Sequence, residues 1–357
     1  MSFFNPIQII DSVTDKPKGL LFNGDAPQIC TQPYMQAIAE GDVAGHTPWS
    51  ASGYTPTMTT AESDLWGNAG VINFPASAAA LEFVSSDNTQ DIGTAIFSGT
   101  SSGGSLTTLI DATKDFTAST AAVAGDCVIL EKAGASPEYG WITAVAATTL
   151  TIAGGFSSGG SASGRTYHVV DYSAKTGAQA IRIRYLDTNY AEKTEIGLLN
   201  GTTVVATVNT DILRINELSM IVAGSGLKPV GNITIRHLSD TPIYSSILAG
   251  QVRAKCSAYT VPAGKTLYIT KMVAGYATSG SPNKEYARLF LRANKHPMST
   301  FLTGAIFYPY SEVLTQNESL PIPFEMPIIV PEKTDMKVSG IASASGVATA
   351  YLEGWLE

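Results

Sequence analysis

The chain has 357 residues, of which 44% are hydrophobic and 15% are charged, and it carries a formal net charge of −8. This length allows two or three domains, and the apolar content predicts a folded chain rather than a disordered one. The acidic balance argues against nucleic acid as a partner, because neutralising phosphates requires a basic face. Since no apolar run approaches the ~18 residues of a membrane span, we also expect no membrane partner.

Residues 1–70 contain scattered aromatic side chains among Pro, Gly and Asp residues, with little sustained periodicity. Only residues 33–40 have the pattern of a helix, which would begin at a proline suited to the first turn. Such a segment cannot bury much surface by itself, so we predict an extended N-terminal arm that docks on this subunit or on a neighbour. The side chains expected to anchor this arm are Phe3, Phe4, Phe22 and Trp49.

Short alternating runs, separated by Gly, Ser, Thr and Asn, predict that nearly all of the remaining chain is β. Residues 71–94 and 173–240 are expected to form a first, discontinuous β-sandwich. Residues 179–186 alternate clearly within it, with Ile181 and Ile183 on one face and two arginines on the other. One face of this strand is therefore predicted to be buried.

Residues 95–172 form a separate block that is bounded by clusters of Ser and Gly. Four or five short strands are predicted inside this block, which suits a small β-barrel inserted in a loop of the first sandwich. Such an insertion is tolerated where the two ends of a loop lie close together. Tyr139 and Trp141 in this block are candidates for surface contacts, with core packing as the alternative.

Residues 241–357 contain seven or eight predicted strands, which suits a jelly-roll-like β-sandwich. Four prolines between residues 321 and 331 are expected at strand edges or joins, since proline cannot donate to a central ladder. Tyr308 and Tyr310 are further candidates for surface contacts, again with core packing as the alternative. The predicted fold class is all-β: two β-sandwich domains, a small barrel inserted in the first, and a preceding arm.

The letters GKT at residues 264–266 match the end of a phosphate-binding loop. That loop requires a glycine at the position of Tyr259 and must open a helix. The residues that follow, 266–273, have the pattern of a strand instead. We therefore interpret residues 262–264 as a tight turn between the two strands of a hairpin.

Pairs of carboxylates are the next candidates for a catalytic site, since a glycosidase needs only two carboxyl groups. Asp87 and Asp91 flank a polar turn, while Glu192, Glu195 and Glu217 alternate with strand residues, as expected of a solvated face. A polysaccharide hydrolase is therefore kept only as a remote alternative.

The histidines and cysteines show no spacing typical of a metal or nucleophilic site. Cys30, Cys127 and Cys256 are odd in number and far apart, so we interpret them as buried small hydrophobes. The oxygen-rich residues 187–189 lack the glycine and the glutamate of an EF-hand loop, and they are typical of a turn. We expect no catalytic residue, no metal and no cofactor.

Several segments, taken in chain order, resemble a structural protein of tailed-bacteriophage particles: residues 64–70 (DLWGNAG), 74–78 (FPASA), 81–86 (LEFVSS), 177–187, 199–203, 213–216, 231–236 and 259–266. The inserted block is similar to small β-domains that recur in phage fibres and decoration proteins, at residues 105–113 (SLTTLIDAT), 125–126 and 147–152. The phage proteins of the first kind often lack an insertion at this point, so the role of residues 95–172 stays open.

The resemblance implies a virion component that is made in the host cytoplasm and has no catalytic residues. It implies a capsid-bound auxiliary or decoration protein, assembled as a homotrimer, whose arm contacts the major capsid protein or neighbouring virion proteins. The alternative is a tail, collar or fibre component that contacts the host surface, including a surface glycan. The sequence leaves both alternatives open.

Overall fold

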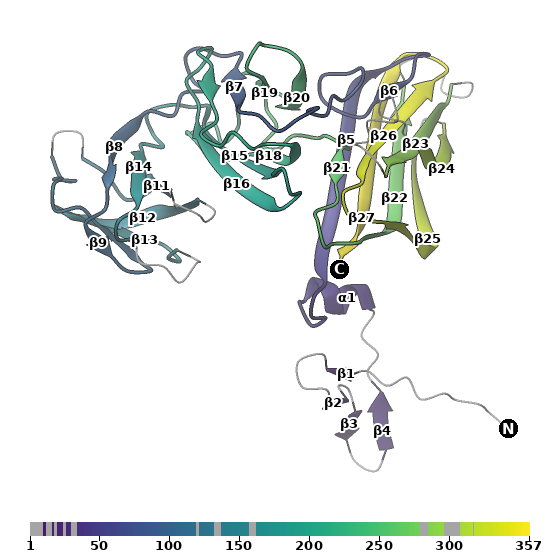
Figure 1. The fold of residues 1–357 in the computed structure, drawn as a ribbon, viewed down its shortest axis with the longest axis horizontal. Coiled ribbons are helices and arrows are strands. Elements are labelled where there is room, and N and C mark those ends of the chain that lie inside the picture. Colours follow the sequence, from purple (N-terminus) through teal and green to yellow (C-terminus); the bar gives the residue numbers. More distant parts are fainter. Residues whose placement is uncertain are drawn as a thin grey trace.

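The chain is almost entirely β in the part that the computed structural model describes (Figure 1). That part comprises residues 10–11, 16–17, 20–23, 26–29, 34–118, 121–131, 137–156, 162–278, 285–295, 308–316 and 318–357, and side chains are described from residue 35 onward except at 308–310. Within these ranges the sheets are antiparallel and none closes on itself. The helix found there, α1 (Tyr34–Ala39), confirms the predicted one. No helix in the same ranges is long and apolar enough to cross a membrane.

The C-terminal unit contains two facing sheets. The first, here named the β5 sheet, has the order β25 (Ser319–Val330), β22 (Leu267–Ala277), β27 (Gly346–Leu356) and β5 (Thr47–Met58). The second, the β23 sheet, has the order β21 (Tyr259–Thr260), β26 (Asp335–Ala342), β23 (Ala287–Asn294) and β24 (Tyr308–Thr315), with β6 (Ser63–Asp64) also paired to β26.

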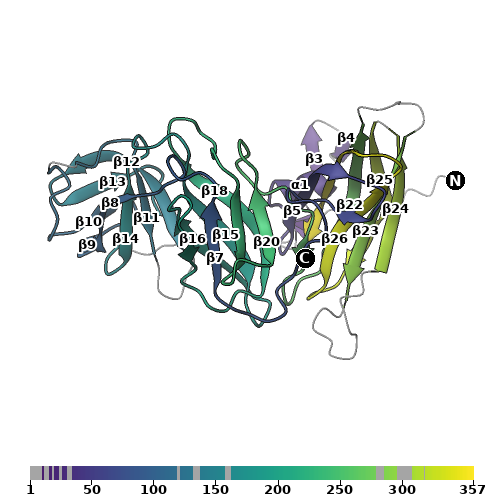
Figure 2. The same ribbon diagram turned by 90° about the horizontal axis from the view of Figure 1, so that it is seen from above.

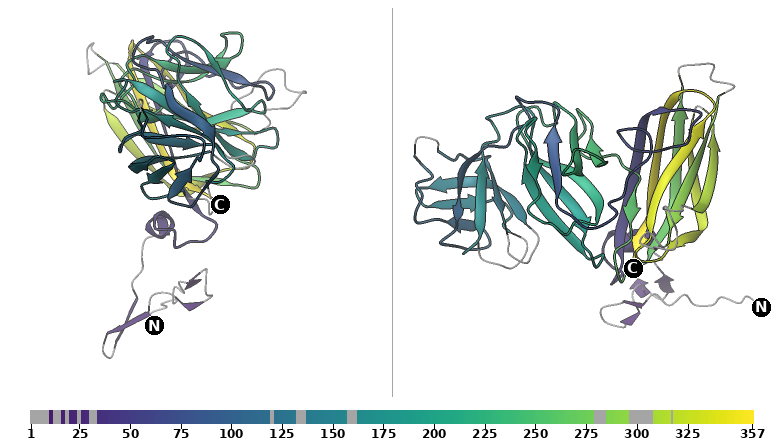
Figure 3. Two further views of the ribbon diagram at one scale, coloured as in Figure 1. Left: turned by 90° about the vertical axis from the view of Figure 1, so that its left-hand side faces the viewer. Right: turned by 45° about the horizontal axis from the view of Figure 1, so that its top comes forward.

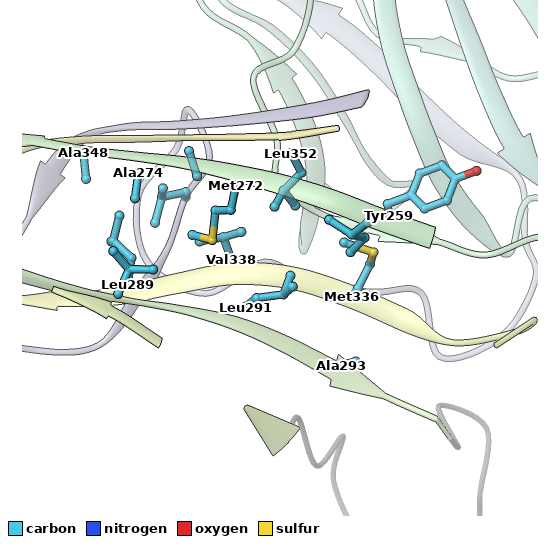
Figure 4. Packing of buried hydrophobic residues seen from close by; sticks show 14 of the residues in the cluster. Tyr259, Met272, Ala274, Leu289, Leu291, Ala293, Met336, Val338, Ala348 and Leu352 are labelled. Carbon is cyan, nitrogen blue, oxygen red and sulfur yellow. The ribbon is translucent and has the colours of Figure 1, made fainter. Parts of the chain in front are cut away.

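The core of the C-terminal unit lies between these two sheets (Figure 4). Met272 and Leu352 extend into it from the β5 sheet, while Leu289 and Val338 extend into it from the β23 sheet. All four side chains are at most 1% exposed. Burying each such side chain stabilises the fold by about 1.5–3 kcal/mol, so this core holds the two sheets together.

Strand β5 lies within the span that the sequence assigns to the arm, yet it pairs with β27 from Thr47 to Met58. The sequence signal for this strand is weak because several of its inward positions carry small residues. At Gly53, an added Cβ would lie 2.8 Å from the backbone oxygen of Leu65, so only glycine fits there. Residues 47–58 are thus part of the C-terminal unit, and the expected boundary at residue 70 is corrected.

The first unit also consists of two facing sheets with a shared core of Phe83, Ile181, Ile183 and Ile235, among others. One sheet has the order β16 (Glu192–Leu198), β15 (Ala178–Leu186) and β18 (Arg214–Ala223). The other has the order β17 (Val205–Ala206), β7 (Leu81–Ser85), β19 (Ile233–His237) and β20 (Ile243–Ile247). Because β20 pairs with β19, this unit extends beyond the expected boundary at residue 240.

The inserted unit is a single seven-stranded sheet with its own core. Its order is β8 (Ala95–Thr100), β14 (Thr166–Val170), β11 (Cys127–Leu130), β12 (Glu138–Ala146), β13 (Thr149–Ile152), β10 (Thr108–Ile110) and β9 (Gly103–Gly104). Leu109, Phe116 and Tyr167 are completely buried inside it. Among the described residues β8 and β9 do not pair, so the sheet is open.

The three units follow one another in a row, with the first unit in the middle (Figure 2). Four short strands precede α1: β1 (Ile10–Asp11), β2 (Lys16–Pro17), β3 (Leu20–Asn23) and β4 (Ala26–Ile29). In the described part of the chain, β1 pairs only with β2, and β3 pairs only with β4. These strands lie on the far side of α1 from the three units (Figures 1 and 3).

Candidate interaction site

The aromatic pair Tyr139 and Trp141 projects from one face of β12. The two side chains are 37% and 39% exposed, and they alternate with the buried Gly140 and Ile142. This placement is the period-two pattern of a strand with one covered face. Both residues can therefore reach a partner, and the surface-contact reading stays open for them.

The face that carries Tyr139 and Trp141 is also the face that contacts the first unit. Directly across the ladder from these residues are Ile129 and Cys127 on β11. Both are at most 2% exposed, because they pack in a cluster with Ala180, Val222 and other residues of the first unit. The two aromatic side chains thus extend this apolar contact beyond its edge.

The structure describes most of the other expected contact residues only in part or not at all. Tyr308 and Tyr310 are both on the edge strand β24, and Tyr308 lies opposite Ala293 of β23. The side chains of both tyrosines lie outside the described part. Phe3 and Phe4 are outside the described residues, and Phe22 is described only as a backbone position of β3.

The side chain of Trp49 is described, and it lies in the core of its own chain. The side chain is 8% exposed and meets the ring of Tyr259 edge to face, with 5.1 Å between the centroids. Burial of so large a ring is worth more within the folded chain than at a transient contact. Trp49 therefore anchors β5 to its own subunit, which is one of the two modes of docking that the sequence leaves open.

A cleft of about 360 Å³ separates the first unit from the β5 sheet. The first unit lines one side with residues of β15, β16, β18 and the segment after β20, and residues 47–52 of β5 line the other. The charged side chains at its surface are Arg184, Glu192, Glu217, Arg253 and Lys265. Such a mixed lining suits a polar segment or a set of structural ion pairs better than a buried apolar ligand.

Glu217 organises the charges beside this cleft. Its carboxylate accepts a hydrogen bond from Arg182 at 2.8 Å, and Arg184 and Arg253 lie 3.6 and 3.9 Å away. Burial raises the pKa of Glu217, but the hydrogen bond from Arg182 and the charges of the three arginines outweigh it and lower the pKa overall. The carboxylate is therefore ionised at neutral pH and neutralises part of the arginine cluster.

A buried ion pair joins the first unit to the C-terminal unit. Arg214 Nε lies 2.9 Å from Asp335 Oδ1, and the two side chains are 3% and 2% exposed. Arg214 Nη1 also donates to the carbonyl of Pro75, and Thr260 Oγ1 donates to Asp335. Both members of this pair thus have further hydrogen-bond partners, which a stable buried charge requires.

The neck of the inserted unit is held by the carboxylate of Asp91, which is completely buried. It accepts hydrogen bonds from the Ser85 hydroxyl and from the backbone N–H groups of Ala178, Val230 and Gly231, at 2.6 to 3.0 Å. These donors come from segments on both sides of the insertion. One side chain thus fixes where the chain leaves the first unit and where it returns.

One of the carboxylates expected on a solvated face is buried. Glu195 is 5% exposed and accepts hydrogen bonds from the N–H groups of Val208 and Asn209 and from the Asn209 amide. Burial raises its pKa, while these bonds act in the opposite direction. Alternation with strand residues could not reveal Glu195 or Asp91 as buried, because the loops that cover them are distant in sequence.

The turn at residues 262–264 is confirmed, with Gly264 at a φ of +72° and the N–H of Lys265 bonded to the carbonyl of Pro262. The predicted hairpin is wrong, however. Strand β21 pairs with β26, whereas β22 pairs with β25 and β27, so the turn carries the chain from one sheet to the other. Local sequence specifies the turn but not which strands pair across it.

The described thiols are poorly suited to nucleophilic chemistry. Burial raises the pKa of both Cys127 and Cys256 to about 12, so each stays protonated at neutral pH. Cys127 is buried and Cys256 is partly buried, while Cys30 lies outside the described residues. In the described ranges no group of three or more His, Cys, Asp or Glu side chains is placed to hold a metal ion.

Comparison with known proteins found no match for this chain among protein-family models, curated proteins or solved structures.

Proposed function

We propose that this protein is a non-enzymatic structural component of a tailed-bacteriophage particle, a capsid-bound auxiliary or decoration protein that assembles as a symmetric oligomer. The observation that carries the proposal is that, among the described residues, β1 pairs only with β2 and β3 pairs only with β4. A two-stranded piece is at best marginally stable by itself in water. The segment before α1 therefore needs a surface on another subunit, which is what an assembly arm provides.

The architecture of the C-terminal unit supports the proposal further. Apart from the short β6, the described part of this unit has eight strands. We number them from first to eighth in chain order: β5, β21, β22, β23, β24, β25, β26 and β27. The β5 sheet then has the order sixth, third, eighth, first, and the β23 sheet the order second, seventh, fourth, fifth. This interleaved order is the one expected of a jelly roll, a fold common in viral capsid domains, and so it supports that proposal.

The hydrophobic cores support the proposed arrangement of the sheets within each unit. The shared cores of the first and C-terminal units support two β-sandwiches. The strands of the inserted sheet share a single core, which supports a barrel-like unit with an open seam. The barrel interpretation requires contact between β8 and β9 through side chains rather than through a ladder.

The test is the abundance of this chain in particles purified from cells infected with the phage that encodes it. Quantitative mass spectrometry should find it in a simple ratio to the major shell subunit. A ratio matching the tail or collar proteins would favour the alternative location. Absence of the chain from purified particles would overturn both.

Deletion of residues 1–33 separates the arm from the folded body. Because α1 and β5 remain, the shortened chain should fold with an unchanged thermal midpoint and yet be missing from particles. Deletion of residues 1–58 is the contrasting variant, since it removes β5 and with it Trp49 from the core. We expect that longer deletion to unfold the C-terminal unit. Full incorporation of the shorter deletion would contradict the role of the arm.

The exposure of Tyr139 and Trp141 favours one second candidate function, contact with the host surface by a tail, collar or fibre component. Replacing both residues by Ala should then reduce adsorption of particles while leaving incorporation unchanged. Equal adsorption by the double variant and the parent would remove this candidate.

A further inference from the structure

The outward face of the β5 sheet carries more apolar surface than a solvated sheet face does. Along β27, Ala348, Ala350 and Leu352 point into the core, so Val347 and Tyr351 point outward, where they are 38% and 40% exposed. Alternate residues of a strand lie on opposite faces. The outward residues of this strand therefore form part of one continuous face with those of β22 and β25.

Near the α1 end of the β5 sheet this face is a row of large side chains. Ile329 on β25 lies opposite Tyr268 on β22, which lies opposite Trp355 on β27. The rings of Tyr268 and Trp355 are stacked, with centroids 5.0 Å apart and planes at 9°. Ile329 is 56% exposed, so the row ends in an uncovered aliphatic side chain.

No core cluster of the described residues includes Val347, Tyr351 or Ile329. A polar interruption is present in the same face, where Lys271 lies 3.4 Å from Glu353. Exposed apolar side chains flank this ion pair on both sides, at Tyr351 and at Ile329, and clusters of exposed apolar side chains mark interaction sites on folded proteins. Trp355 itself is 7% exposed and lies beside His46, but among the described residues no core cluster covers the rest of this face.

The hairpin formed by β3 and β4 is apolar and needs a surface to pack against. Its ladder runs from Leu20 opposite Ile29 to Asn23 opposite Ala26. Its sequence LLFNGDAPQI is rich in large apolar residues, yet the hairpin pairs with no other strand in the described part of the chain. A hairpin of this kind becomes stable when it packs against another layer.

The connection to α1 restricts where this hairpin can lie. Five Cα steps separate Ile29 from Tyr34, and at about 3.6 Å each they span at most about 18 Å. Helix α1 contacts β5, and Ile38 within it is 1% exposed. The hairpin is therefore held close to the α1 end of the β5 sheet, on the side of α1 away from its own body (Figures 1 and 3).

We propose that the β3–β4 hairpin of one copy packs on the outward face of the β5 sheet of a second copy, over Ile329 and Tyr351. This inference rests on the proposed function and names the partner of the arm as another copy of this chain. Contact is through the face of the sheet, because Pro321 and Pro323 on β25 weaken its edge for strand addition. Repeated around an axis, the exchange produces a closed oligomer.

The first test is the oligomeric state of the full-length chain by light scattering. We expect an oligomer for the parent chain and monomers for two variants, the deletion of residues 1–33 and the face variant Ile329→Asp with Tyr351→Asp. The matched control is Leu314→Asp on β24, a 60% exposed aliphatic residue outside this face. That control should remain oligomeric, and circular dichroism should show that all variants are folded.

A second test distinguishes exchange between copies from docking of a hairpin on its own sheet. In a Cys30→Ser background, Phe22→Cys is placed in one chain and Ile329→Cys in another carrying a size tag. Mixing and oxidation should give a disulfide between the two chains, which runs as a heterodimer on a non-reducing gel. A double-cysteine chain that crosslinks only within itself would overturn the inference.

The outcomes also separate this inference from the proposed function. A parent chain that is monomeric in solution, or an oligomer unaffected by either the deletion or the face variant, would overturn the hairpin exchange. If such a chain were still incorporated into particles, the structural role would stand. Absence from particles of a chain that does exchange its hairpin would overturn the role alone.

Discussion

The first unit is joined to its two neighbours by contacts that differ in kind. The inserted unit packs on it through an apolar cluster that includes Ile129, Cys127 and Val222. The C-terminal unit also makes small apolar contacts with it, but in addition it is joined through the buried ion pair of Arg214 and Asp335, beside a charged cleft. Apolar burial is nondirectional and tolerates small shifts, whereas a buried ion pair is favourable only in one geometry. The difference predicts which junction tolerates substitution.

The largest effect is expected at the ionic junction. In Arg214→Ala the carboxylate of Asp335 stays buried without its partner, which should lower the free energy of unfolding by about 3–5 kcal/mol. Urea unfolding of the C-terminal unit, followed by tryptophan fluorescence, measures this change. Arg288→Ala is the control, because its pair with Glu312 is exposed and screened by solvent, so its loss should change the free energy of unfolding little. Equal losses in the two variants would contradict the comparison.

Replacement of both charged partners sharpens this result. Arg214→Leu with Asp335→Leu removes the uncompensated charge and should recover much of the loss seen in Arg214→Ala. A double variant as unstable as the single one would show that the additional bonds to Pro75 and Thr260 dominate the junction.

At the apolar junction, Ile129→Ala should cost about 3 kcal/mol through lost burial and the cavity left behind. The inserted unit should stay folded, since Ile129 faces away from that unit's own core. Limited proteolysis is expected to cut the neck of the insertion faster in this variant. Tyr139→Ala, at the exposed edge of the same face, serves as control and should leave the cleavage rate unchanged.

Asp91→Asn tests the hydrogen-bonded neck with a smaller change. The amide keeps one acceptor oxygen but directs N–H groups at backbone donors, so we expect a loss of about 1–3 kcal/mol. Hydrogen exchange at the N–H groups of Ala178, Val230 and Gly231 should accelerate. Asp115→Asn, which changes a carboxylate on the surface of the insert, is the comparison. Unchanged exchange in Asp91→Asn would show that the neck does not depend on the charge.

The smallest effect is a pH dependence at the cleft. The folded-state pKa of Glu217 lies below its ordinary value of 4.5 because the arginine cluster outweighs burial. The carboxylate thus contributes stability above that value, and this contribution is lost as the pH falls through the folded-state pKa. The stability difference between the parent and Glu217→Gln should be largest at neutral pH and disappear in acid. A difference that grows in acid would have the wrong sign.

Much of the local structure could be predicted from the sequence. The alternation around Ile181 and Ile183 predicts the buried face of β15, and the short helix before β5 is found where the proline predicts it. The turn at Gly264 is likewise local, because a positive φ favours glycine. Each of these features depends on residues within a few positions of one another.

The candidate sites could be predicted only in part. Tyr139 and Trp141 are exposed, as their use as contacts requires, but Trp49 is buried in its own unit. The pair of Arg214 with Asp335 joins residues 121 positions apart, and no motif relates them. Glu195 and Asp91 have polar neighbours in sequence, although distant loops cover both.

By itself the sequence determined the all-β class and the turn at Gly264, since strand period and turn chemistry depend on neighbouring residues. Only the tertiary structure decided that β5 completes the C-terminal sheet, that β21 and β22 belong to different sheets, and which charges are buried. These outcomes depend on pairing between segments far apart in the chain. A strand pattern states which face is apolar, but it does not state which partner will cover that face.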